Sequence, residues 1–122
     1  MSLSYSFEVS GVEEFTLAMD VFSEEIRSQV REVFHELGAN IKEFARAIVP
    51  VRTGYLQSTI YYRTAEWEIT VGARALYAGY VEYGTRYMAP QPYLGPAFDF
   101  YEPQVVALMV YAIEEAKLVA GL

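Results

Sequence analysis

The sequence predicts an α+β fold in which an antiparallel sheet with a central hairpin packs against a long helix in the N-terminal half and a C-terminal helix. Two segments with apolar residues at helical spacing flank a segment in which apolar and polar residues alternate, as in half-buried strands. The chain has 122 residues, 53% hydrophobic and 20% charged, which is enough for one core. We therefore expect residues 1–122 to form a single domain.

The N-terminal half begins with alternating apolar and serine residues, which predict a strand over residues 3–9. Residues 12–19 fit either a turn of helix or an extended connection. From Asp20 to Pro50, apolar side chains at steps of three, four and seven predict a helix of about 28 residues, with Asp20 or Ser23 as its N-cap. The apolar stripe consists of Phe22, Ile26, Val30, Val33, Leu37, Ile41, Phe44 and Ile48. A helix this long overhangs a small sheet, so we expect part of the stripe to meet another subunit.

The second half begins with a turn at residues 51–54, followed by a predicted strand over 56–63. Alternation over residues 67–71 predicts the partner strand, with the hairpin turning near Thr64 and Ala65. Glycines, prolines and tyrosines over 75–95 predict a loop with one helical turn at 76–83. The last helix begins near Pro96 or, more cleanly, at Pro103, and Gly121 ends it. Its core face consists of Val105, Leu108, Met109, Ala112, Ile113, Ala116 and Val119.

Charge and composition exclude several classes of protein. The net charge of −7 makes general nucleic-acid binding unfavourable, since an acidic surface repels phosphate. Without cysteine the chain forms no disulfide and no thiolate metal site. The first residues lack a basic region followed by an apolar stretch, and no run reaches the roughly 18 apolar residues of a membrane span. We expect a soluble protein that is made inside a cell and does not enter a membrane.

Few residues are candidates for chemistry. His35 is the only histidine and is expected to be a solvated side chain on a helix face. Glu82 lies between apolar neighbours, where a carboxylate needs a partner, and Arg52, Arg74 and Arg86 are candidates. A structural ion pair, or hydrogen bonds to backbone amides, fits Glu82 better than a role as catalytic acid. No phosphate-binding loop or nucleophile with a base is present, so we expect no catalytic set, and His35 lacks the further ligands that a metal site needs.

Tyrosine is concentrated in the second half of the chain, where nine of the eleven fall within 47 residues. Tyrosine combines a large contact area with few rotatable bonds and a polar tip, and it is enriched at protein interfaces. We expect about half of these tyrosines in an interface and half in the core. They lie at positions 55, 61, 62, 77, 80, 83, 87, 93 and 101.

Three sequence blocks resemble the tail-component family named after the tenth gene product of phage HK97. The blocks are residues 50–60, residues 77–85 and residues 91–98, and the similarity runs in order from about residue 3 to residue 120. The motif residues are Pro50, Thr53, Gly54, Leu56, Ser58, Glu82, Gly84, Thr85, Pro92, Leu94, Pro96 and Ala97. One departure is Gly95, which stands where this family often has arginine before the final proline and alanine.

The resemblance implies a structural protein of the virion, similar to neck and tail-completion proteins that form rings, without enzymatic activity or cofactor. We expect it to contact copies of itself, in a ring such as a hexamer, and neighbouring neck or tail proteins. We also expect it to be made in the host cytoplasm and to act in the particle of a phage or prophage. The candidate interface residues are Tyr77, Tyr80, Tyr83, Tyr87 and Tyr93. Two alternatives are a regulatory binding module with an exposed aromatic groove, and a hydrolase with a concave pocket around Glu82.

Overall fold

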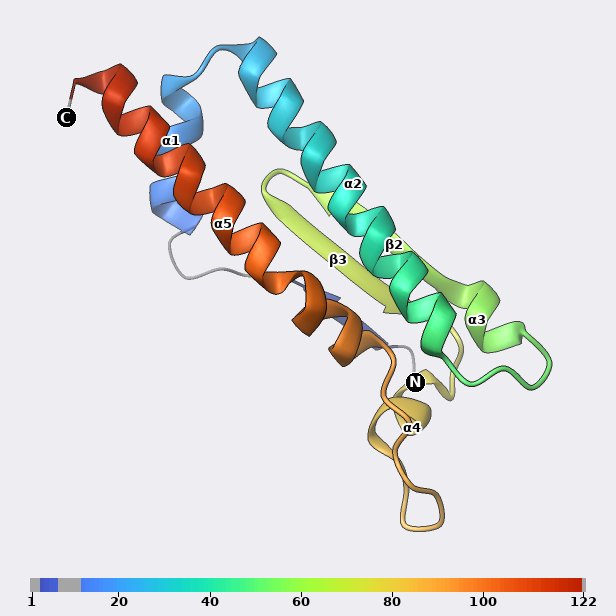
Figure 1. Cartoon of the computed structure of the whole chain (residues 1–122). Helices are drawn as coiled ribbons and strands as arrows, with labels where there is room; N and C mark the ends of the chain where they lie inside the picture. Colours follow the sequence, from blue (N-terminus) through green and yellow to red (C-terminus); the bar gives the residue numbers. More distant parts are fainter. Residues whose placement is uncertain (1–2, 7–11, 122) are drawn as a thin grey trace.

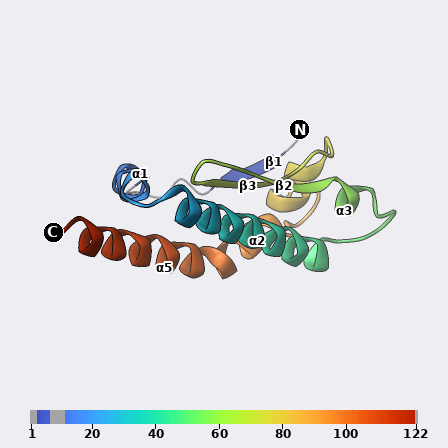
Figure 2. The same cartoon turned by 90° about the horizontal axis from the view of Figure 1, so that it is seen from above.

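A computed structural model describes residues 3–6 and 12–121 and confirms the α+β class. Helices α2 and α5 lie side by side and cover one face of a small sheet, while the other face carries no helix in the part of the chain described (Figures 1 and 2). In chain order the elements are β1 (Leu3–Ser6), α1 (Val12–Val21), α2 (Glu24–Ile48), α3 (Tyr55–Thr59), β2 (Ile60–Ala65), β3 (Glu68–Ala73), α4 (Ala78–Tyr83) and α5 (Leu94–Ala120).

The sheet has the strand order β1-β3-β2, and both pairings are antiparallel. The predicted hairpin is confirmed, but its turn lies at Glu66 and Trp67, two residues later than expected. Trp67 adopts a positive φ of 62°, and its indole packs into the core, so packing fixes the position of the turn. Of the strand predicted over 3–9, residues 3–6 form β1 and residues 7–9 lie outside the described residues.

The long helix α2 begins after Ser23, whose hydroxyl accepts a hydrogen bond from the Ile26 amide at 3.4 Å. Ser23 rather than Asp20 is therefore the N-cap, and the helix ends just before Pro50 as predicted. The predicted stripe is displaced by one residue in places, because apolar side chains occur at adjacent positions of this helix. The fully buried residues are Phe34, Leu37, Gly38, Ile41 and Ala45, whereas Ile26, Val33 and Ile48 are exposed.

Two helices occupy segments that were ambiguous or differently predicted. Residues 12–21 form α1, and its Phe15 and Met19, one turn apart, are buried. Residues 56–59 were expected in a strand, but Tyr55–Thr59 is the helix α3 and the strand begins at Ile60. Hydrogen bonds between hydroxyl side chains and the backbone explain why this segment is helical and not extended. The Thr53 hydroxyl accepts a bond from the Tyr55 amide, and the Ser58 hydroxyl donates to the Tyr55 carbonyl at 2.6 Å.

The C-terminal helix α5 begins at Leu94, two residues before Pro96, so the alternative start at Pro103 is wrong. Pro103 lies inside the helix, although it lacks an amide hydrogen for the helical bond. Gly121 ends the helix with φ 77°, as predicted. On the predicted core face, Val105, Met109, Ala112 and Ala116 are buried, Leu108 and Ile113 are half-buried, and Val119 is exposed.

The core lies between the sheet and the two long helices. Near the hairpin turn, Trp67 meets Phe15 and Phe34 edge-on at centroid distances of 5.4 and 5.9 Å. Midway along α2, a Cβ on Gly38 would lie 2.7 Å from Cδ2 of Tyr62, so glycine allows the close approach of helix and sheet here. No helix among residues 12–121 has the length and apolarity to cross a membrane.

Candidate functional site: an aromatic lobe

An aromatic lobe, which we define as residues 76–93, projects beyond the end of the sheet (Figure 1). It contains α4 and the loop that leads to α5. Tyr77, Tyr80, Tyr83 and Tyr87 are 42, 56, 62 and 88% exposed. Four of the five predicted interface tyrosines therefore lie on the surface of one projection.

Glu82, on α4, connects the lobe to the first turn of α5 through hydrogen bonds. The side chain is 3% exposed, and Oε1 accepts bonds from the amides of Tyr93 and Leu94, both at 2.9 Å. Oε2 accepts a third bond from the Gly95 amide at 3.0 Å. These amides have no partner within the helix, and the positive end of the helix dipole favours a carboxylate there. Of the two kinds of partner predicted for Glu82, hydrogen bonds to backbone amides are confirmed.

The arginines considered as partners of Glu82 lie elsewhere. Within the described residues, no salt bridge joins Glu82 to Arg52, Arg74 or Arg86. The Arg74 guanidinium lies 3.9 Å from the ring centroid of Tyr61, and that of Arg86 lies 5.4 Å from the centroid of Tyr87. Both oxygens of Glu82 are occupied and buried, so this carboxylate is not placed to exchange protons with a substrate. The hydrolase alternative depended on Glu82 as its catalytic acid, and the structure does not support it.

The loop after α4 is closed by its own hydrogen bonds. The Thr85 amide donates to the Met88 carbonyl at 2.8 Å, and the Met88 amide donates back at 3.3 Å. The Thr85 hydroxyl also accepts a bond from the Tyr87 amide at 3.1 Å. Further along, the Gln91 amide donates to the Val81 carbonyl at 2.8 Å, which returns the loop to α4. Tyr87 is thus presented on an ordered tip.

Gly84 is required at the point where this loop leaves α4. Its φ is +79° with ψ 177°, and a Cβ there would lie 2.7 Å from the Pro90 nitrogen and 2.8 Å from the Met88 oxygen. We expect Gly84→Ala to lower the free energy of unfolding by about 2 to 4 kcal/mol in urea denaturation. Gly54→Ala is the matched control, because Gly54 has a φ of +84° with open space around it. Equal losses in the two variants would mean that the Pro90 contact is unimportant.

Tyr93 is the exception among the predicted interface tyrosines, because it is fully buried. Its hydroxyl donates to the Ala78 carbonyl at 3.1 Å and ties the start of α4 to the start of α5. Burial, followed by the negative charge of Glu82 and the nearby Tyr77, raises the pKa of the Tyr93 phenol far above its ordinary value. Tyr93 supports the lobe from within and is not a surface residue.

The raised pKa of Tyr93 predicts an alkaline loss of stability. Above pH 10, where an unfolded tyrosine loses its proton, the folded state keeps it, so this contribution to stability falls as pH rises. We expect Tyr93→Phe to cost about 1 kcal/mol at pH 7 through the lost hydrogen bond. The difference between the wild type and Tyr93→Phe should shrink above pH 10, as measured by urea unfolding at pH 7 and pH 10.5. A difference that is constant with pH would contradict the assigned burial of the phenol.

The other motif residues lie in and beside the same end of the molecule. Pro50, Thr53 and Gly54 form the connection that leaves α2, and the Tyr55 ring at its end lies 6.3 Å from that of Tyr77 in the lobe. Leu56, Leu94 and Ala97 are buried, Pro96 is half-buried, and Ser58, Thr85 and Pro92 are exposed. The first two sequence blocks therefore meet through Tyr55 and Tyr77, while the third supplies the amides bound by Glu82.

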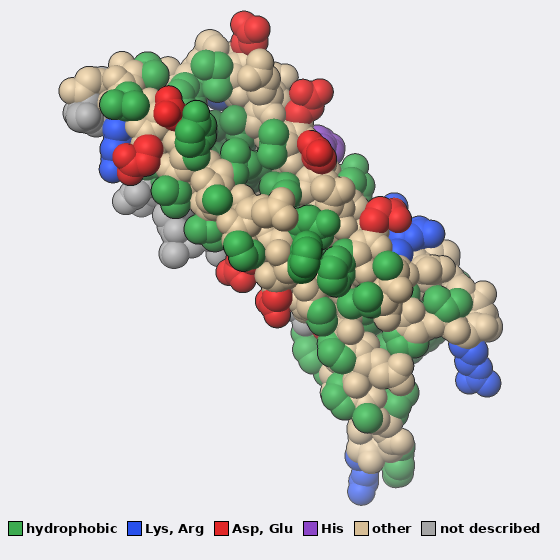
Figure 3. Space-filling view, in the orientation of Figure 1, with side chains coloured by type: hydrophobic (Ala, Val, Ile, Leu, Met, Phe, Trp, Pro, Cys, Tyr) green, Lys and Arg blue, Asp and Glu red, His purple; other side chains and the backbone are tan. Residues whose placement is uncertain are grey.

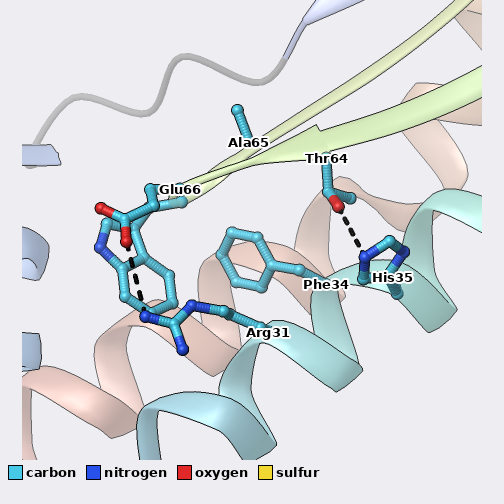
Figure 4. A pocket seen from close by; sticks show the side chains of 7 residues that line it. Arg31, Phe34, His35, Thr64, Ala65 and Glu66 are labelled. Atoms are coloured by element: carbon cyan, nitrogen blue, oxygen red, sulfur yellow. Dashed lines mark hydrogen bonds and ion pairs between the residues drawn. The ribbon is translucent and has the colours of Figure 1, made fainter. Parts of the chain in front are cut away.

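A small pocket of about 190 Å³ lies near the hairpin turn, remote from the lobe (Figure 4). His35 is exposed as predicted, and its Nε2 lies 3.0 Å from the Thr64 hydroxyl. Arg31 bonds Glu24 at 2.6 Å and Glu66 at 3.5 Å, and the Arg31 bond holds the pKa of Glu24 below its ordinary value. In the described part of the chain, no three histidine or acidic side chains gather as metal ligands. The polar groups at this pocket are engaged with one another.

Sequence reasoning missed one surface feature, an apolar stripe on the outer side of α5. Val106, Val110 and Tyr111 are 39, 53 and 65% exposed. Their spacing places them on the same side of a helix, and this spacing could have predicted the exposed stripe from the sequence. It was hidden because the same helix also carries the apolar residues of its core face.

Comparison with known proteins identifies the family. Residues 13–84 match the family described as "Bacteriophage HK97-gp10, putative tail-component". The matched range contains the first sequence block and nearly all of the second, and the third block lies beyond it. No curated protein and no solved structure matches the chain. Since the match covers more than half of the 122 residues, the chain belongs to the HK97 gp10-like family of phage tail components.

Proposed function

We propose that this tail component is a morphogenesis protein at the head–tail joint or the tail end of a tailed phage or prophage. It acts there by self-association and by contacts with neighbouring virion proteins. The family gives the chain a structural role in the virion. We also propose that the subunits assemble in the host cytoplasm and that they form a ring, such as a hexamer.

The aromatic lobe is the observation that carries the proposal. Four tyrosines and Leu76, which is 77% exposed, form an apolar and hydrogen-bonding surface on a projection that contributes Ala78 and Tyr93 to the buried core and packs Val81 against it. Exposed aromatic groups of this density are typical of interfaces. Because Glu82 and the loop's own bonds fix the lobe in advance, binding would order little additional backbone.

Mutation of the lobe tests this proposal. We expect Tyr80→Ala combined with Tyr87→Ala to weaken self-association about tenfold or more in sedimentation velocity, because both rings lose their contact area. The folded structure should be unaffected, since the two side chains are 56 and 88% exposed. The matched control is Leu17→Ala with Leu118→Ala, which removes exposed apolar side chains from α1 and the end of α5. Unchanged association of the tyrosine variant would exclude the lobe as an interface.

A further inference from the structure

The outer side of α5 carries a shallow, open surface, which we call the trough, and it combines apolar with acidic side chains. Val106, Val110 and Tyr111 line it together with Asp99, Glu102 and Glu114. The residues that line the trough include three acids and no base. An occupant that suits this surface carries an apolar or aromatic group together with a positive charge.

The tip of the aromatic lobe has this chemistry. Tyr87 is 88% exposed, and the Arg86 guanidinium lies 5.4 Å from its ring centroid, so cation and ring form one unit. The tip is held by the paired bonds between Thr85 and Met88. The one acid of the lobe, Glu82, is buried on the amides of α5, which leaves the exposed surface of the lobe positive.

The distribution of charge along the chain also favours association between copies. Residues 51–95 contain three acids and four bases, whereas residues 96–122 contain four acids and one base. In the space-filling view, basic side chains stand at the ends of the projecting loops, and acidic side chains, together with some basic ones, lie along the helical layer (Figure 3). Two copies in the same orientation therefore bring opposite charges together when the lobe of one meets the helices of the next.

We propose that copies of the chain associate head to tail, with the Arg86–Tyr87 tip of one copy in the trough on α5 of the next. This rests on the self-association proposed above and names the two surfaces. The lobe points away from the helical layer of its own chain (Figure 1), so the tip meets a trough only on another molecule. Such a contact is heterologous, and an open chain of copies keeps one free tip at one end and one free trough at the other until it closes into a ring.

Two complementary variants test the head-to-tail contact. The tip variant is Arg86→Glu with Tyr87→Ala, and the trough variant is Val106→Glu with Val110→Glu. Each alone is expected to be a monomer of about 13.8 kDa in light scattering, because each has lost one half of every contact. An equimolar mixture should form a heterodimer of about twice that mass and nothing larger, since the mixture retains one intact tip and one intact trough.

The matched control is Arg52→Glu with Val51→Ala, which reverses one charge and truncates one exposed apolar side chain on the connection between α2 and α3, and it should associate like the wild type. Circular dichroism checks that every variant is folded. If the trough variant unfolds, Glu102→Arg takes its place; alone it should weaken association, and combined with Arg86→Glu it should restore it. Association of the tip variant by itself, or a mixture that stays monomeric, would overturn the head-to-tail contact. A wild type that never associates would instead refute the proposed self-association.

Discussion

Replacing Glu82 by alanine is expected to lower the free energy of unfolding by about 3 to 5 kcal/mol, measured by urea denaturation followed by circular dichroism. The substitution leaves the amides of Tyr93, Leu94 and Gly95 without the carboxylate that now accepts all three bonds. An unsatisfied buried donor costs about 1 to 3 kcal/mol, and Gly95 is near enough to solvent for water to replace part of its bond. The start of α5 should also fray, which releases the lobe.

Glu82→Gln separates the hydrogen bonds from the side-chain volume. One amide oxygen can still accept the two bonds now made by Oε1, but the NH2 group would face the Gly95 amide, donor against donor. We expect a smaller loss of about 1 to 2 kcal/mol. Glu25→Ala, on the exposed first turn of α2, is the control and should change stability by less than about 0.5 kcal/mol. A Glu82→Ala variant as stable as this control would refute the capping role.

Replacing Trp67 by alanine is expected to cost about 3 to 5 kcal/mol, because it empties the space beside the stacked rings of Phe15 and Phe34. In the turn between β2 and β3, the backbone of Trp67 adopts a left-handed conformation, with a φ of 62°, which is strained for a residue with a side chain. Glycine adopts this conformation freely, so Trp67→Gly should recover about 0.5 to 1 kcal/mol relative to Trp67→Ala. Urea unfolding followed by circular dichroism measures both, since the variants lack the only tryptophan.

The control for the tryptophan variants is Tyr87→Ala, which removes an aromatic ring that is 88% exposed. Its free energy of unfolding should stay within about 0.5 kcal/mol of the wild type. If Trp67→Gly were the less stable of the two tryptophan variants, the turn would not hold the strain that its positive φ indicates.

Periodic patterns predicted the elements whose packing they determine. The α2 helix and the alternation of Trp67, Ile69 and Val71, all three of which are buried, follow from apolar spacing in the sequence. Segments governed by hydrogen bonds between distant residues were placed less well. The start of α5 at Leu94 depends on Glu82, twelve residues earlier, and no local pattern around Pro96 contains that information. That residues 1–122 form a single domain stays a prediction.

The candidate site was predictable in composition and less so in detail. The tyrosine cluster followed from the residues themselves, and so did a structural role for Glu82, although the sequence left open whether its partner was an arginine or backbone amides. The burial of Tyr93 did not, because an exposed and a buried tyrosine look alike in a proline-rich segment. Its hydroxyl bond to Ala78 forms only when α4 and α5 are in place. The trough on α5 was missed for a different reason, because the same helix also carries the apolar residues of its core face.

Self-association is tested most directly by the mass of the purified wild-type chain, measured by light scattering coupled to size exclusion over a concentration series. We expect a mass above 13.8 kDa that rises with concentration toward a whole multiple of the chain, because the exposed lobe of one copy is buried by another. A mass that stays at 13.8 kDa up to the highest soluble concentration would contradict assembly through contacts between copies.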